Sequence, residues 1–187
     1  MTPRLEAAYA EPHRRHHDRD HIAHCLALLD QVEGLAEGER RLLTWAIWWH
    51  DAVYDPKASD NEARSAEMAR ADLAELGASD AERDEVARLI RLTAEHRVES
   101  GDRLGAILVS IDLAILGAEP PAYDAYARAV REEYAHLPES LWRAGRGRVL
   151  QTFLAMPALY PDPVLRARLE APARVNLARE LASLTPA

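Results

Sequence analysis

The hydrophobic positions of this chain follow a helical period almost throughout. Runs that alternate apolar and polar residues, as half-buried strands do, are nearly absent, and Ala, Leu, Glu and Arg dominate the sequence. Ile22, Leu26 and Leu29, for example, fall on one face of a helix. The pattern therefore predicts an all-α protein.

Breaks and capping signals divide this pattern into about eight or nine helices. Glu11-Pro12-His13 interrupts the first helix, Gly77 is a candidate C-terminal cap, and Pro120-Pro121 opens a later helix. Ser59-Asp-Asn-Glu62 and Ser79-Asp-Ala-Glu82 both match the capping box and predict helix starts. The expected helices cover approximately residues 3–10, 18–32, 39–51, 59–76, 79–96, 103–116, 120–137, 139–156 and 163–183.

The length and cysteine content fit one domain in a reducing compartment. The 187 residues suffice for a substantial core, and no repeat or linker interrupts residues 1–187, so we expect a single domain. One cysteine, Cys25, excludes an intrachain disulfide. No apolar run reaches the roughly 20 residues of a membrane span, and no secretory signal is visible. We therefore expect a cytoplasmic protein without membrane contact.

The net charge limits the partners that the chain can bind. The sequence has 31 Asp and Glu against 23 Lys and Arg, a formal charge of −8. Bulk binding to nucleic acid needs a basic face and is not expected. A small phosphorylated ligand remains compatible, because a few arginines and a metal ion bind phosphate locally. A homodimer is left open.

Histidines are concentrated near the N-terminus, where five of the eight lie between residues 13 and 24. His17, His21 and His24 would share one helix face if the helix began early enough. Such a face binds a divalent metal through neutral imidazoles. The alternative is a polar, solvated helix start beside the neighbouring arginines.

Two acidic positions adjoin strongly apolar runs. His50-Asp51 follows Thr44–Trp49, which contains three tryptophans, and Asp112 lies within the apolar segment 105–117. A buried carboxylate without a partner is costly, so each position requires one. For His50-Asp51 the alternatives are a metal ion or a helix C-terminal cap. For Asp112 they are an arginine, a helix N-terminus or a cation. The three tryptophans are expected to pack the core beside the site.

His21, His50-Asp51 and Asp112 occur in the order H…HD…D, each on or at the end of a predicted helix. This order resembles the HD-domain superfamily of metal-dependent phosphohydrolases. Further phrases are similar to a bacterial branch known as predicted HD-superfamily hydrolases, and they extend the resemblance from about Tyr9 to the last helix. These phrases are Glu11–His17, Trp49–Pro56, Asp60–Ser65, Thr93–His96 and Asp112–Gly117.

The resemblance implies an all-α HD fold, with a metal-site core over about residues 9–117 and C-terminal helices over about 120–183 packed on it. It implies one divalent ion held by four ligands, His21, His50, Asp51 and Asp112. Imidazole mixed with carboxylate suits Mn²⁺, Fe²⁺, Co²⁺, Ni²⁺ or Zn²⁺ and leaves Mg²⁺ open. The implied activity is hydrolysis of a small phosphorylated substrate, such as a nucleotide, by metal-activated water. Only one histidine, His96, lies between the HD pair and the final aspartate, which favours a mononuclear site.

Residues near these ligands are candidates for catalysis and substrate binding. Asp51 and Glu62 are the candidate catalytic groups, and Glu62 would either orient and deprotonate water or close the Ser59 capping box. The candidates for substrate binding or ligand orientation are His17, Arg14, Asp55, Arg64 and His96. His96 could contact phosphate or a second metal. Each has a simpler alternative, as a surface ion pair, a helix-terminal histidine or an acid that ends a helix.

The alternative function is a metal- or ligand-binding regulatory module of HD fold without turnover. In that case the C-terminal helices would form a partner surface with four aromatic anchors, Tyr123, Tyr126, Tyr134 and Trp142. Aromatic residues at helical spacing belong more often to a core. The sequence leaves both readings of these aromatics open.

Overall fold

The computed structural model describes residues 2–184, and within that range the protein has nine α-helices, one 3₁₀ helix and no strand. The all-α prediction is confirmed. The elements are α1 (Pro3–Tyr9), α2 (Arg19–Asp30), α3 (Glu37–Trp49), α4 (Asn61–Glu75), α5 (Asp80–Leu92), α6 (Arg103–Asp112), η1 (Leu113–Gly117), α7 (Pro120–Glu133), α8 (Glu139–Ala155) and α9 (Pro163–Leu184). Among these residues no single helix combines the length and apolarity needed to cross a membrane, although α6–η1 and α7 do so as a pair bent by 103°.

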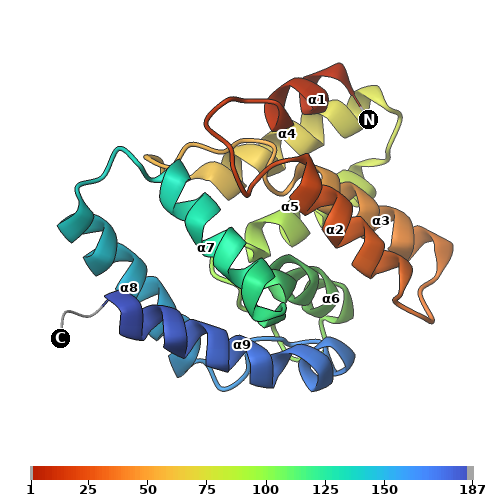
Figure 1. Ribbon diagram of the computed structural model, residues 1–187. Coiled ribbons are helices and arrows are strands. Elements are labelled where there is room, and N and C mark those ends of the chain that lie inside the picture. The colour runs from red at the N-terminus through yellow and green to blue at the C-terminus, as the bar shows by residue number, and fades with distance from the viewer. Residues whose placement is uncertain (1, 185–187) are drawn as a thin grey trace.

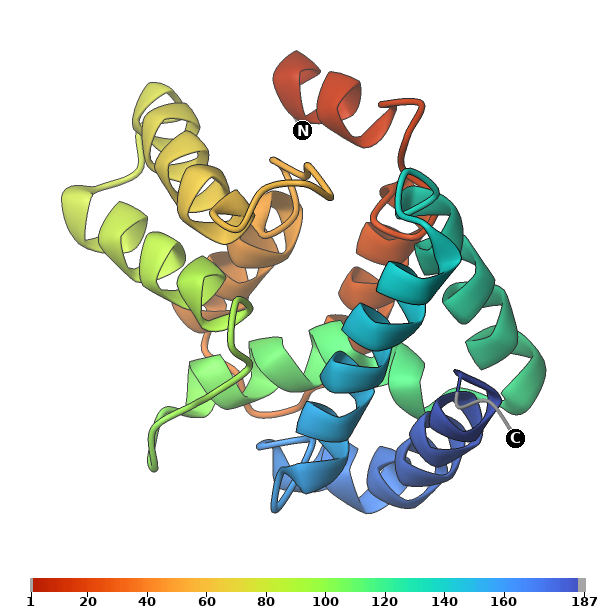
Figure 2. The same cartoon turned by 90° about the vertical axis from the view of Figure 1, so that its left-hand side faces the viewer.

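The helices form two groups with separate hydrophobic cores (Figure 1). The first core lies among α1 to α6 and includes Leu43 and Ile90, which are fully buried; all three predicted core tryptophans pack in or against it. The second core joins η1, α7, α8 and α9 around Tyr123 and Leu150. In Figure 2, α4 and α5 lie on one side, α7 and α8 on the other, and α6 runs between the two groups.

Helix α6 is apolar because it contributes to both cores. Ile107, Leu108 and Ile111 pack in the first core, and Val109 packs in the second. A helix that neighbours bury on several sides needs apolar residues all round, unlike the one-sided stripe of a surface helix. Asp112, the last residue of α6, is thereby carried to the junction of the two helix groups.

One helix that the sequence predicts over residues 103–116 is divided into α6 and η1, so that prediction is wrong in its last four residues. Contacts with α9 accompany the change. The Asn176 side chain donates N–H groups to the carbonyls of Leu116 and Ala118, at a helix end where carbonyls have no partner within the helix. A Cβ atom at Gly117 would lie 2.8 Å from atoms of α9, so only glycine allows this close approach.

The two capping-box predictions have different outcomes. Ser79 and Glu82 exchange the two expected hydrogen bonds at the start of α5, which confirms the second box. Helix α4 begins at Asn61 without a side-chain cap, so the prediction of a box at Ser59 is wrong. Asn61 exchanges two hydrogen bonds with the backbone of Asp55 and fixes the preceding turn instead.

The start of α2 decides which histidines share a helix. Asp18 is the N-cap, and its carboxylate accepts the N–H groups of Asp20 and His21. His17 therefore lies before the helix, and His24 is exposed, so the three-histidine face does not form. His21 alone of the three points into the interior from the first turn of α2.

Candidate metal centre and its pocket

Three ligand-type side chains converge between the start of α2 and the end of α3. The Nε2 atoms of His21 and His50 lie 3.1 Å apart. Oδ2 of Asp51 lies 3.1 Å from Nε2 of His50 and 3.7 Å from Nε2 of His21. Donor atoms that share one ion at bond lengths of about 2.0–2.2 Å are about 3.0–3.5 Å apart. His21, His50 and Asp51 therefore form a group that could hold a metal ion.

Asp112 reaches the same group from the end of α6. Its Oδ1 lies 3.3 Å from Nε2 of His21 and 3.4 Å from Nε2 of His50. Its second oxygen, Oδ2, lies 3.2 Å from Nε2 of His96. The two positions that the sequence marks as costly, His50-Asp51 and Asp112, thus meet where the end of α3 lies beside the end of α6.

The His50 ring is oriented so that Nε2 faces the group. Its Nδ1 lies 2.8 Å from the carbonyl oxygen of Ile47, to which it donates its N–H. In the neutral ring the lone pair is then on Nε2, the atom directed at His21 and the carboxylates. The carbonyl of the preceding helical turn thus selects the tautomer that a metal ligand needs.

The electrostatics of the group favour positive charge at its centre. Burial lowers the pKa of His50, but the carboxylates of Asp51 and Asp112 outweigh burial and raise it well above its usual value. Burial raises the pKa of both carboxyl groups, yet their histidine contacts hold each pKa well below its usual range. Two carboxylates in a protein interior require such compensation.

Cys25 lies beside the group but is not a member of it. Its Sγ is 3.8 Å from Nε2 of His21. Burial raises the pKa of the Cys25 thiol above its usual value. The donors within the group are imidazole nitrogens and a carboxylate oxygen.

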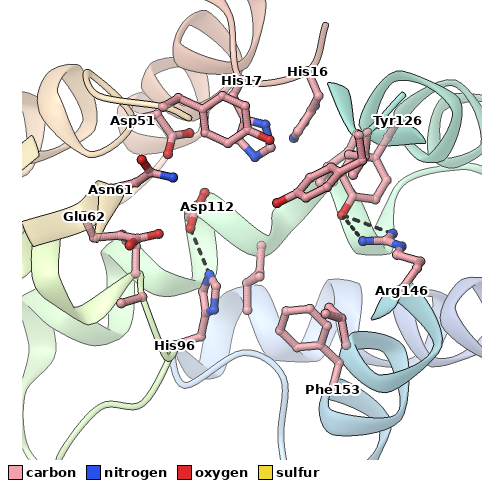
Figure 3. A pocket seen from close by; sticks show the side chains of 18 of the residues that line it. His16, His17, Asp51, Asn61, Glu62, His96, Asp112, Tyr126, Arg146 and Phe153 are labelled. Carbon is pink, nitrogen blue, oxygen red and sulfur yellow. Dashed lines mark hydrogen bonds and ion pairs between the residues drawn. The ribbon is translucent and has the colours of Figure 1, made fainter. Parts of the chain in front are cut away.

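Asp51 and Asp112 line a pocket with a volume of about 700 Å³, shown from close by in Figure 3, whereas His21 and His50 are not among its lining residues. Asp51, Glu62 and Asp112 stand on one side of this pocket, and Tyr126 and Phe153 stand opposite. The volume falls in the range of small-molecule sites, about 300–1,000 Å³.

The four C-terminal aromatics belong to this interior and do not form an exposed surface. Tyr123 and Trp142 are buried, and Tyr126, Tyr134 and Trp142 line the pocket. The partner surface built on these residues is therefore absent from the part of the chain that the structure describes.

Glu62 and His96 both line the pocket. Without a capping box at the start of α4, the Glu62 carboxylate makes no hydrogen bond or ion pair within residues 2–184. His96 is not helix-terminal, because α5 ends at Leu92; it lies in the following loop with φ of 55°. Tyr126, Trp142 and Phe153 form one side of the pocket, here called the aromatic wall. The ring centroids of His96 and Phe153 are 5.6 Å apart, so this histidine lies between Asp112 and the aromatic wall.

Arg14 is directed away from the pocket and holds the backbone behind it. The side chain is buried, and its guanidinium donates to the carbonyls of His17, Asp51 and Ala52. A fourth contact is an ion pair with Glu11. These contacts hold the loop after α1 against the segment that carries His50-Asp51. They also occupy the N–H donors of the Arg14 guanidinium, so these donors are not available to bind a phosphate group.

The other predicted contacts have mixed outcomes. Arg64 is exposed and pairs with Asp60 at the surface, which matches the simpler alternative. The Asp55 carboxylate accepts the backbone N–H of Lys57, as an acid in a turn does, and does not line the pocket. His17 does line the pocket, although from the loop before α2.

Glu133, which the sequence reasoning missed, holds the histidine loop in place. Its side chain is fully buried at the end of α7. Oε1 accepts the backbone N–H groups of Arg15, His16 and His17 at 2.7, 2.8 and 3.1 Å. Oε2 lies 2.7 Å from Nδ1 of His17 and accepts the hydroxyl of Tyr54 at 2.9 Å. One carboxylate thus positions both pocket-lining histidines of the loop.

His16 also lines the pocket without having been predicted. Its ring centroid lies 4.8 Å from that of His21 and 4.6 Å from that of Tyr126. Burial lowers the pKa of His16 well below its usual value, and the neighbouring His17 and His21 lower it further. The ring is therefore a neutral link between the metal-ligand group and the aromatic wall.

Comparison with known proteins does not assign the chain to a family: no family model, no curated protein and no solved structure matches it. The structure itself brings His21, His50 and Asp51 into one group, places Asp112 within 3.4 Å of both histidines, and adds Glu62, His17 and His96 around them. The site must be judged on this geometry.

Proposed function

We propose that the protein is a metal-dependent phosphohydrolase of the HD type, acting on a small phosphorylated molecule. The observation that carries the proposal is the group of His21, His50 and Asp51 beside an open pocket, with Oδ1 of Asp112 3.3 and 3.4 Å from Nε2 of the two histidines. The nitrogen and oxygen donors suit a first-row divalent ion and leave Mg²⁺ open. A nucleotide is one candidate substrate.

The residues around the group fit hydrolysis. A divalent ion bound there would lower the pKa of water towards neutrality and neutralise charge on a phosphoryl oxygen. Glu62, whose carboxylate has no hydrogen-bond or ion-pair partner among residues 2–184, is the candidate to accept a proton from the attacking water. His17 and His96 line the same pocket, where they would contact the phosphoryl group. Water attacks phosphorus, the bond from phosphorus to the ester oxygen breaks, and the alcohol leaves with a proton.

Metal analysis combined with a substrate panel tests the proposal. Purified protein, stripped and reloaded with Mn²⁺, Co²⁺ or Mg²⁺, should take up about one ion per chain and release phosphate from generic phosphate esters. A chelator should stop the reaction. Failure to take up any ion would overturn the proposal, and ion binding without release of phosphate would favour the binding module.

Substitutions at the carboxylates test the site. Asp51→Ala and Asp112→Ala should each reduce turnover by about a thousandfold or more, because each removes a metal ligand. Asp60→Ala, at an exposed aspartate paired with Arg64, is the matched control and should keep normal turnover. Circular dichroism should show intact helices in all three. Near-normal activity in either pocket variant would show the site assignment to be wrong.

A further inference from the structure

The pocket has a second wall of different character from the metal-ligand group. Phe153, Tyr126 and Trp142 line it, together with aliphatic side chains such as Leu116 and Val149. Figure 3 shows Tyr126 and Phe153 facing the carboxylates across the open space. A surface of this kind binds the apolar part of a small molecule, whose burial stabilises the complex in proportion to the area removed from water.

Two histidines lie between this aromatic wall and the candidate metal ligands, and each of them contacts both. His96 lies between Asp112, at 3.2 Å, and Phe153, whose ring centroid is 5.6 Å away. His16 lies between His21 and Tyr126, with centroid separations of 4.8 and 4.6 Å. A ligand with a phosphoryl group at the carboxylates would therefore place its adjoining organic part directly against the aromatic wall.

The pocket offers almost no positive charge of its own. Among its lining residues within the described chain there is one arginine, Arg146, and no lysine. Its Nε and Nη2 atoms pair with the Glu180 carboxylate at 2.8 and 3.0 Å, and Nη1 and Nη2 face the Tyr126 hydroxyl. The guanidinium is thus already neutralised. Four acids also line the pocket: Asp51, Glu62, Glu95 and Asp112.

We propose that the substrate is a phosphate monoester whose organic part is apolar or aromatic, and that polyphosphates and small polar phosphates are poor substrates. This inference rests on the proposed function, which places the phosphate at the metal-ligand group. One divalent ion offsets the charge of one phosphate. A triphosphate would bring further negative charge towards four acids, with no unpaired arginine or lysine to bind it.

Kinetics with three simple compounds test the inference. With Mn²⁺-loaded protein, kcat/KM is measured for 1-naphthylmethyl phosphate, glycerol 3-phosphate and inorganic tripolyphosphate; the first two both release an alkyl alcohol. The naphthyl ester should exceed each of the others by about tenfold or more, because it alone buries an apolar group on the aromatic wall. Equal or faster hydrolysis of glycerol 3-phosphate or tripolyphosphate would overturn the inference and leave the proposed function standing.

Binding decides the inference separately from turnover. If none of the three compounds is hydrolysed, the proposed function fails, and calorimetry then compares naphthylmethylphosphonate with methylphosphonate on the Mn²⁺-loaded protein. Both compounds carry one phosphonate and differ in the apolar group. The naphthyl compound should bind about tenfold tighter or more. Equal affinities would contradict the assigned role of the aromatic wall.

Substitutions on the aromatic wall locate the effect. Phe153→Ala should reduce the preference for the naphthyl ester over glycerol 3-phosphate by about tenfold, and Phe153→Leu by less. Val149→Glu changes a side chain that is 44% exposed, so it avoids the core, and should lower the same preference. Val175→Ala, 66% exposed on α9, is the control. An unchanged preference in both Phe153→Ala and Val149→Glu would overturn the inference.

Discussion

Two buried groups of charged side chains in this protein differ in what completes them. Arg146 and Glu180 form a bidentate ion pair. The Tyr123 hydroxyl donates to Glu180, and the Tyr126 hydroxyl accepts from Arg146. That group carries both signs of charge and needs nothing else. The group around Asp51 and Asp112 brings two carboxylates to two imidazoles and includes no arginine or lysine.

The difference separates a structural group from a binding group. In the ion pair, donors and acceptors face one another along parallel hydrogen bonds. In the other group, the Nε2 atoms of His21 and His50 lie 3.1 Å apart, and each lies 3.1–3.7 Å from one oxygen of Asp51 and one oxygen of Asp112. Imidazole and carboxylate donors gathered in this way are the set that a cation completes.

Removing one acid from each group should have unequal effects on stability. Glu180→Gln leaves the buried Arg146 without its counter-charge and should lower the free energy of unfolding by about 3 kcal/mol. Asp51→Asn should change it by less than about 1 kcal/mol in the presence of a chelator, because the substitution removes one of two adjacent carboxylates. Urea denaturation followed by circular dichroism measures both. Similar losses in the two variants would show that both groups are structural.

Glu133 connects the second helix group to the site, and its loss should weaken metal binding. Glu133→Gln removes the charge that holds Nδ1 of His17 and three backbone N–H groups of the loop before α2. We expect Mn²⁺ affinity, measured by calorimetry, to fall about tenfold to a hundredfold. Glu132→Gln is the matched control, since Glu132 is an exposed neighbour paired with Arg15. Equal affinities in the two variants would leave Glu133 with a purely structural role.

The two Ser-x-x-Glu segments show a similar contrast: in one the glutamate completes its hydrogen bonds within the segment, and in the other it does not. At Ser79 the box is complete, whereas Glu62, three residues after Ser59, lines the pocket. Ser79→Ala should therefore cost about 1 kcal/mol of stability, and Ser59→Ala close to nothing. Thermal unfolding of both variants gives the comparison. A loss at Ser59 equal to that at Ser79 would mean that the first box forms in solution.

Two of the candidate ligand positions could be found from the sequence because they conflict with their surroundings, whereas His21 and the complete set of four followed from the resemblance. Asp112 in an apolar helix and His50-Asp51 after three tryptophans both signal a cost that some partner must offset. Arg14 and Glu133 gave weaker signals. Arg14 sits in a polar, charged segment, and Glu133 lies 116 residues from the histidine that it contacts. No local pattern reports a partner at that distance along the chain, although Glu133 does share a helix face with the buried Val130.

The sequence by itself determined the all-α class, most helix ends and the types of the candidate metal ligands. These features depend on interactions within a few residues, such as caps and the helical period of apolar positions. Only the tertiary structure decided that His21, His50, Asp51 and Asp112 meet, that α6 gives way to η1 beside α9, and that Arg14 turns from the pocket to the backbone. Such outcomes depend on which helices pack together, and that is settled by the burial of both cores at once.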